Sequence, residues 1–335
     1  MLKKLFSLFQ GAGAPPETPQ AGPGIPPPAE VAVPGAPPLP IAAHISLHEG
    51  FPRLAWEPVQ TWVEALAGDE ARSHAWTAAE RAWLLHMRQA LGPDFRVSES
   101  ANAMLVSSLE PHVARATLDY MERTLVRVGR LLDGIGQVPP WGKDLLLVFD
   151  DEESYYRYVS YFYPASGEFA FSGGMFISAG CSHYVTMKND LRVVEPVIAH
   201  EMTHAFVSHL PLPLWLNEGL AVNTEHRLAG AHPSHTPQEM RAKHLAYWGE
   251  QEIQEFWSGE SFMRTDDGNL LSYDLARLIV GHFAQDWDVF KAFVLEANAA
   301  DAGAAAADGH FGVDLGEIAC ALLEREHSGE WSPRR

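Results

Sequence analysis

Apolar and polar residues along the middle of this chain recur with two different periods. From 109 to 132 the apolar residues recur every three or four positions, which predicts a long amphipathic helix closed by Gly134. A strand is predicted over 102–107, and the continuous apolar run within 144–149 predicts a fully buried strand. Further elements follow the same patterns: a tyrosine-rich helix over 152–162 and two strands over 169–178 and 182–187. This region is therefore expected to combine a small mixed sheet with helices.

The later part of the chain carries only helical periodicity. Two prolines end one apolar helical segment near 210, and a second helix is expected to start near 213 and to continue to about 228. Three further helices are predicted over 238–257, 272–295 and 315–324, and an Ala/Asp/Gly-rich linker over 298–309. The carboxyl-terminal part is therefore expected to form a helical lobe, and the fold class is α+β.

Two segments precede this region and divide the chain into three predicted parts. Residues 11–41 hold eleven of the 24 prolines, so 1–41 is expected to be a disordered leader without a core. Residues 42–94 are expected to form a helical appendage whose tryptophans lie in its core. Thr77 and Glu80 have the spacing of a capping box at a helix start, and Gly92-Pro93 ends that helix. The third part is a domain over 95–327.

Composition restricts the partners of the protein. The 335 residues carry a formal net charge of −19, which argues against binding to phosphate backbones and to anionic membrane surfaces. Apolar residues make up 47% of the chain, enough for a sizeable core, yet no run of 18 apolar residues predicts a membrane-spanning helix. We therefore expect a peptide or protein partner and no nucleic acid. The sequence does not indicate an oligomeric state.

Cysteine usage and the amino terminus bear on the compartment. Cys181 and Cys320 are far apart and do not form a disulfide framework, so each is expected to be a small buried side chain. A basic start, Lys3-Lys4, precedes an apolar patch of about five residues, which is shorter than the 7–15 that a secretory signal needs. We expect a cytoplasmic protein, although this signal-like start leaves export open.

The segment with the clearest chemistry is 197–207, an apolar, helix-compatible stretch that contains His-Glu-x-x-His. Residues four apart share one face of a helix, so His200 and His204 can direct ring nitrogens at one Zn²⁺. Glu201 would flank this ion, where a general base that takes a proton from water is needed. With 16 histidines in the chain, a helix that carries two of them by chance is the competing interpretation.

A third ligand is available on the next predicted helix. Thirteen residues separate His204 from Glu218, and a short turn into an antiparallel helix would return the Glu218 carboxylate to the metal. Gly219 would allow a close approach of the backbone. A solvent-exposed Glu218 on an ordinary helix is the alternative.

These motifs together resemble a known family. The run from His200 to His204, followed by Trp215-Leu216-Asn217-Glu218-Gly219-Leu220-Ala221, is similar to the gluzincin clan of zinc peptidases and most similar to its peptidase-MA-like group. The resemblance implies a zincin-like domain, a zinc ion held by His200, His204 and Glu218, and hydrolysis of peptide bonds by a zinc-activated water with Glu201 as general base. Val207 and Leu210 exclude the metzincin pattern, which needs Gly and His at these positions.

The resemblance is incomplete around the ligands. Related enzymes carry an acidic residue four places after the third ligand, where it supports a zinc histidine, but this chain has Val222 there. The partner of His200 or His204 is thus unidentified from sequence. The resemblance also implies a donor to the oxyanion of the reaction, for which we favour Tyr273; alternatives are Tyr184, Tyr247 and His244.

The resemblance further implies an edge strand that binds extended substrate through its main chain. The stretch 171–176, with Gly173, Gly174 and Met175 at its centre, is the candidate, and an ordinary strand is the alternative. Arg277 could meet a substrate carboxylate, although a helix-surface ion pair is favoured. As substitute ligands we considered His209, His226 and Glu225 and prefer Glu218 to each.

Two functions follow from this sequence. The first is a zinc metallopeptidase. The second is a zincin-like module without catalytic activity that binds a protein through its acidic surface. An intact Glu201 beside the ligands favours the peptidase, because a binding module needs no base next to the metal.

Overall fold

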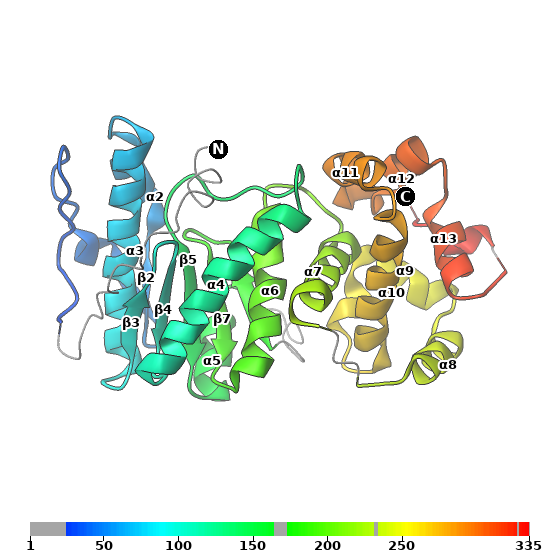
Figure 1. The fold of residues 1–335 in the computed structure, drawn as a ribbon, viewed down its shortest axis with the longest axis horizontal. Coiled ribbons are helices and arrows are strands. Elements are labelled where there is room, and N and C mark those ends of the chain that lie inside the picture. Colours follow the sequence, from blue (N-terminus) through cyan, green and yellow to red (C-terminus); the bar gives the residue numbers. More distant parts are fainter. Residues whose placement is uncertain (1–24, 164–172, 231–233, 327, 335) are drawn as a thin grey trace. The chain divides into compact units, whose positions relative to one another are not determined.

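The computed structural model describes residues 25–163, 173–230, 234–326 and 328–334. Over these residues the protein is mixed α and β, as expected (Figure 1). The described residues form a five-stranded sheet, 12 α-helices and a two-stranded sheet, and the last lies in the segment 42–94 that was predicted to be helical. As far as they are described, Met1–Arg127, Val138–Pro164 and Gly173–Ile198 form one compact unit, and Val128–Gln137 with Ala199–Arg335 form another. No described helix is both long and apolar enough to cross a membrane.

The five-stranded sheet belongs to the first unit and has the order β3-β4-β5-β7-β6. Its strands are β3 (Arg96–Glu99), β4 (Ala103–Ser107), β5 (Asp144–Phe149), β6 (Gly174–Ile177) and β7 (His183–Met187). The central strands β4, β5 and β7 pair in parallel, while hairpins place β3 and β6 antiparallel at the two edges. The buried strands β4 and β5 correspond to the predicted strands 102–107 and 144–149. Parallel strands that are covered on both faces need continuous apolar residues, as in the run within 144–149.

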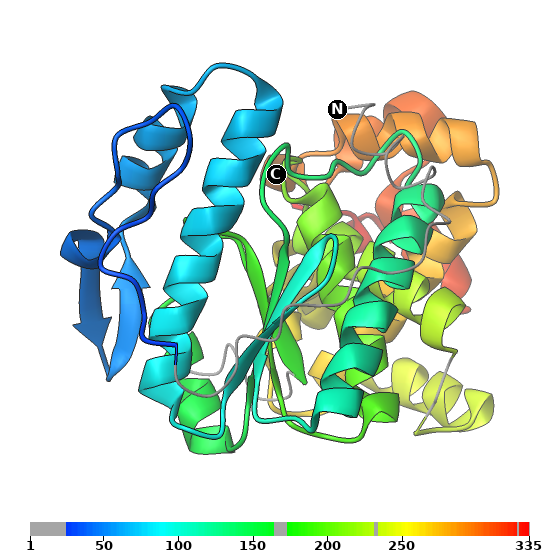
Figure 2. The same ribbon diagram turned by 60° about the vertical axis from the view of Figure 1, so that its left-hand side comes forward.

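The first unit also contains helices, among them α2 (Trp56–Glu64), α3 (Asp69–Leu91), the first part of α4 (Pro111–Leu131) and α5 (Glu152–Val159). Of these, α3 and α5 contact strands of this sheet. Figure 2 shows α3, in cyan, running beside the strands. A two-stranded sheet, β1 (Ile45–His48) with β2 (Phe51–Leu54), lies before them in the chain.

The start predicted for the helix at Thr77 is wrong, because α3 begins at Asp69 and Thr77 lies buried inside it. The Glu80 carboxylate, which a capping box would direct back to Thr77, instead accepts hydrogen bonds from the Lys143 amide at 3.0 Å and from the Cys181 thiol at 3.6 Å. Tertiary contacts with residues more than 60 positions away thus override the local capping pattern.

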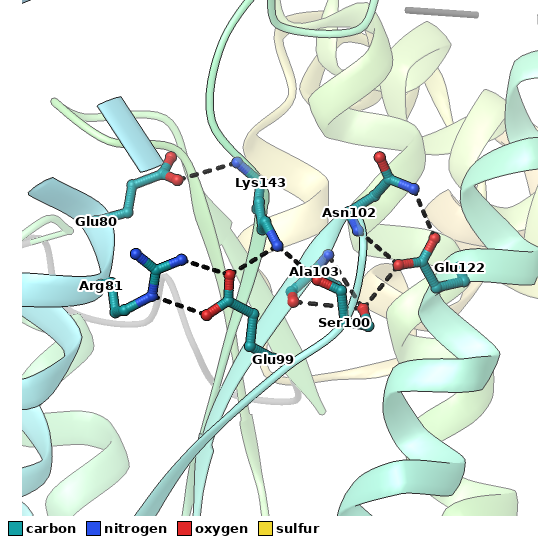
Figure 3. A network of polar contacts seen from close by, with 8 residues as sticks. All are labelled: Glu80, Arg81, Glu99, Ser100, Asn102, Ala103, Glu122 and Lys143. Atoms are coloured by element: carbon teal, nitrogen blue, oxygen red, sulfur yellow. Dashed lines mark hydrogen bonds and ion pairs between the residues drawn. The ribbon is translucent and has the colours of Figure 1, made fainter. Parts of the chain in front are cut away.

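A polar network ties the β3–β4 hairpin to its neighbours (Figure 3). Glu99 binds the Arg81 guanidinium from α3 through two hydrogen bonds and the Lys143 ammonium at 2.7 Å. Burial alone would raise the pKa of Glu99, but these two cations lower it. Across the turn, Glu122 of α4 accepts from the backbone and side-chain amides of Asn102 at 2.6 and 2.8 Å. The network fixes the position of the edge strand β3.

The described part of the predicted disordered leader, residues 25–41, is ordered. Val31 and Leu39 form an isolated β-bridge, and both side chains are buried. The Trp62 indole donates to the carbonyl of Pro37 at 2.8 Å, so a donor outside the segment satisfies one of its backbone acceptors. The proline content of this stretch predicted disorder, but its apolar side chains Val31 and Leu39 are buried in the folded protein. Residues 1–24 lie outside the described part of the chain.

The second unit is helical in its described residues, as expected for the carboxyl-terminal part. It contains the ends of α4 and of α6 (Leu191–Val207), together with α7 (Leu214–Ala229), α8 (Pro237–Tyr247), α9 (Glu250–Ser258), α10 (Asp267–Phe283), α11 (Trp287–Glu296), α12 (Ala304–Phe311) and α13 (Leu315–Leu322).

Three of the predicted boundaries in this unit are wrong. The helix expected over 238–257 is two helices, because Trp248 leaves the helical conformation and its buried indole donates to His244 Nδ1 at 2.8 Å. The helix expected over 272–295 is also two, and the Asp286 side chain caps the second. The stretch 298–309, expected to be a linker, contains most of α12.

Candidate metal centre

Helix α6 brings the two histidines of the motif together. His200 and His204 lie one turn apart, with ring centroids separated by 4.8 Å and ring planes inclined at 76°. Ala199, Met202 and Thr203 of the same helical segment are fully buried. The helix therefore presents both rings in a fixed orientation, as the four-residue spacing predicts.

Helix α7 supplies the third group. Helix α6 ends at Val207, and α7 begins at Leu214 immediately after Pro213, whose extended backbone serves as the N-cap. The fully buried Trp215 anchors the first turn, since its indole donates to the carbonyl of Ala302 at 2.9 Å. Glu218 follows in the second turn.

Gly219 permits a close approach between α7 and α10. A Cβ atom at this position would lie 2.7 Å from the carbonyl oxygen of Ala276 and 2.6 Å from a methyl group of Val280. The Asn223 side chain, one turn further along α7, donates to the carbonyl of Arg277 at 3.0 Å. The absence of a side chain at Gly219 therefore sets the depth at which α7, and Glu218 with it, packs on α10.

The three side chains converge. Glu218 Oε2 lies 3.2 Å from His200 Nε2 and 3.6 Å from His204 Nε2, and the three ligand atoms all lie within 4.8 Å of one another. Ligands about 2.1 Å from a tetrahedral Zn²⁺ are separated by about 3.4 Å, so the spacing fits this ion. Their side chains are 12–15% exposed, which leaves an approach for a further ligand. Among the described residues, this is the group of His, Cys, Asp and Glu side chains that could hold a metal.

The other ring nitrogens have partners of their own. His200 Nδ1 lies 3.1 Å from Glu225 Oε2, and His204 Nδ1 lies 2.9 Å from Asn217 Oδ1. Both partners are acceptors, so each ring donates from Nδ1 and leaves Nε2, on the Glu218 side, as the nitrogen that could bind a metal ion once it is deprotonated. Neither partner was identified from sequence. The available signals were the position of Glu225, seven residues after Glu218 on the same helical face, and that of Asn217 directly before Glu218.

Glu225 had been considered as a substitute ligand, and the structure corrects this alternative. Its carboxylate contacts the Nδ1 side of His200, whereas Glu218 occupies the Nε2 side. Glu225 therefore contacts the side of His200 away from Glu218 and does not take the place of Glu218.

The charges of the site favour a bound cation. Burial would lower the pKa of His200, but its hydrogen bonds to Glu218 and Glu225 raise it well above the usual value. Burial would raise the pKa of Glu218, but the neighbouring His204 and His200 lower it. A buried carboxylate that is held ionised between two imidazoles needs positive charge beside it, which a proton or a divalent metal ion can supply.

The predicted general base, Glu201, and the predicted oxyanion donor, Tyr273, lie near these residues. Glu201, which follows His200 directly, is 7% exposed. The ring centroid of Tyr273 lies 6.4 Å from that of His200. Burial raises the pKa of Tyr273 well above its usual value, and the charges of Glu218, Glu201 and Glu225 raise it further. Tyr273 lies in the second turn of α10 and not at a helix start as expected, because α10 begins earlier, at Asp267.

The residues considered as alternatives to Tyr273 have other surroundings. Tyr184 lies on β7 of the first unit and donates to Asp144 at 3.0 Å. His244 has both ring nitrogens engaged, accepting from Trp248 and donating to Asp274 at 2.9 Å.

The remaining candidates are accounted for as follows. Arg277 binds Asp274 through two nitrogens at 3.0 and 2.6 Å, which agrees with the favoured ion pair on the helix surface. His209 and His226 are not part of the metal-binding group among the described residues. Gly174 and Met175 lie on the edge strand β6 of the first unit, with Gly173 directly before it. A role of these three residues in substrate binding stays a prediction, and Phe171 and Ser172 of the same candidate strand lie outside the described residues.

Comparisons with known proteins add no assignment. No family model matches the chain, and neither a curated protein nor a solved structure matches it. The residues of the site themselves are therefore the basis for assigning a function.

Proposed function

We propose that this protein is a zinc-dependent metallopeptidase with a zincin-like domain, as the resemblance of its motifs to the gluzincin clan implies. The observation that carries the proposal is the convergence of His200 Nε2, His204 Nε2 and Glu218 Oε2 at the spacing of a tetrahedral zinc site. The acceptors beside the two Nδ1 atoms also favour the proposal. A histidine that binds a metal through one ring nitrogen almost always donates a hydrogen bond from the other.

When bound, Zn²⁺ would act as a Lewis acid on the scissile carbonyl and would lower the pKa of a coordinated water toward about 7. The residues of the chain supply the remaining chemistry. Glu201, beside the ligands, accepts the proton of the attacking water and passes it to the leaving amine. Tyr273, whose phenol is protonated at neutral pH, donates to the developing oxyanion.

The proposed substrate is a peptide or protein, bound in extended form along β6 at Gly173, Gly174 and Met175. The proposed compartment is the cytoplasm, in line with the two free cysteines, Cys181 and Cys320, both of which are buried.

The decisive experiment compares the parent chain with Glu201→Gln. We expect about one zinc per chain in both proteins by elemental analysis, and cleavage of a mixed peptide library by the parent alone. Glu57→Gln, an exposed position on α2, is the matched control and should cleave as the parent does. Glu218→Ala should lose the metal.

Each other outcome has a definite meaning. Zinc in the parent without cleavage of any peptide would favour the second function, a binding module without catalysis. Full zinc affinity in Glu218→Ala would remove the third ligand and with it the proposed site.

A further inference from the structure

The two histidines of the centre are supported by groups of different charge. His200 donates from Nδ1 to the carboxylate of Glu225, whereas His204 donates to the neutral amide oxygen of Asn217. An ionised acceptor makes the stronger hydrogen bond and raises the basicity of the ring that donates to it. The two rings are therefore unequal ligands, and His200 depends on the residue at position 225.

The geometry of α7 explains why this residue is a glutamate. Positions 218, 222 and 225 share one face of the helix, at intervals of four and three residues. Val222, between the two acids, is 9% exposed and carries no polar atom. Helical side chains lean toward the amino terminus, so a long side chain at 225 extends back past Val222 toward the turn that holds Glu218. An aspartate at 225 would be shorter by one methylene group.

We propose that Glu225 is the positioning residue for His200: its carboxylate fixes the ring with the proton on Nδ1 and with Nε2 directed at the metal. The inference rests on the proposed metal centre and deepens it. Charge and side-chain length are both required, because the carboxylate must reach the ring across the turn that Val222 occupies. Its side chain is 28% exposed, compared with 12% for Glu218, which agrees with a supporting role at the border of the site.

Zinc affinity of the full-length chain, measured by competition with a chelator, tests this assignment. Glu225→Ala and Glu225→Asp should each bind zinc about 10–100-fold more weakly than the parent, which is the usual effect of removing such a partner. Glu225→Gln keeps the length and an acceptor but loses the charge, and should fall between them and the parent. Arg227→Ala, on the exposed side of the same helix, should bind zinc as the parent does.

A second measurement separates positioning from general stability. The visible spectrum of the Co²⁺-substituted protein reports ligand geometry, and it should change in Glu225→Asp. The unfolding midpoint of the metal-free chain should stay close to that of the parent in Glu225→Gln. If Glu225→Ala does not fold, the nearly isosteric Gln variant decides the question through its affinity.

The possible failures are distinct. If the parent binds no zinc, the proposed function is wrong and this inference with it. If the parent binds zinc and both Glu225→Ala and Glu225→Gln bind it within twofold as tightly, Glu225 has no positioning role although the metal centre stands. If Glu225→Asp equals the parent, the requirement for length is wrong.

Discussion

Gly219 offers a direct test of how the centre is built. Replacing it with alanine adds one methyl group where α7 meets α10, at 2.7 Å from the carbonyl oxygen of Ala276 and 2.6 Å from Val280. The Val280 methyl can move aside by a small side-chain rotation, but the Ala276 oxygen belongs to the helix backbone. The two helices must therefore separate by a few tenths of an ångström or more.

Two effects of this change have opposite signs. Alanine is favoured over glycine inside a helix by roughly 0.5–1 kcal/mol. Overpacking of a tightly packed contact destabilises by about 1–3 kcal/mol, and a clash with rigid backbone belongs at the upper end of that range. The steric effect is larger, so we expect Gly219→Ala to lower the free energy of unfolding by about 2 kcal/mol. Because Glu218 is the adjacent residue, the shift of α7 should also weaken zinc binding.

Urea unfolding of the metal-free proteins measures this effect, and Gly281→Ala on α10 is the matched control. A Cβ at Gly281 would meet only the Asn223 amide oxygen, at 3.5 Å, which is ordinary van der Waals contact. The same substitution should therefore stabilise the protein there, by about 0.5–1 kcal/mol. Opposite signs at the two glycines would support the reasoning. A Gly219→Ala protein as stable as Gly281→Ala, with parental zinc affinity, would refute it.

Two further expectations concern pH and metal. Burial lowers the pKa of His183 to about 4, so between pH 6.5 and 4 the unfolded chain binds a proton there that the folded protein does not. Stability from this ring is complete above pH 6.5 and falls toward pH 4 by roughly 3 kcal/mol; a pH series of urea unfolding in which His183→Gln loses as much stability as the parent would contradict this. Zinc at a hundred times its dissociation constant should raise the free energy of unfolding by about 2.7 kcal/mol. A chelator should reverse that gain in thermal melts, and an equal response in Glu218→Ala would place the ion elsewhere.

Local patterns predicted the elements of the site well. The four-residue spacing of His200 and His204 places both rings on one helical face whatever surrounds the helix. Pro213 ensured a new helix start shortly before Glu218, because its fixed φ suits that position. Convergence of Glu218 with the histidines was an expectation from motif spacing, and the distances agree with it.

The supporting residues were missed for a physical reason. A residue that supports a ligand is defined by its distance from a ring nitrogen, and that distance depends on how two helices cross. Glu225 is one of several acids on the helices of this chain, and only the packing of α7 beside α6 distinguishes it. The proximity of the Tyr273 and His200 rings likewise depends on the position of α10 and is not encoded in the local sequence.

The predicted boundaries failed at contacts that the helical period does not record. In 238–257 the break is local: the Trp248 indole bonds to His244, four residues earlier, at the end of α8, and Gly249 is the N-cap of α9. Likewise, Thr77 and Glu80 have the spacing of a helix start, but Glu80 is used to bind Lys143 and Cys181.

By itself, the sequence indicated most of the helices and strands of the site, and which residues could bind a metal, because both depend on neighbours a few positions apart. The tertiary structure decided which carboxylate faces Nε2 of His200, which one faces Nδ1, and how closely α7 approaches α10. Those choices depend on contacts between segments separated by tens of residues, for which no local period exists. A glycine and a pair of acids on one helix, Gly219, Glu218 and Glu225, acquire their separate roles only through that packing.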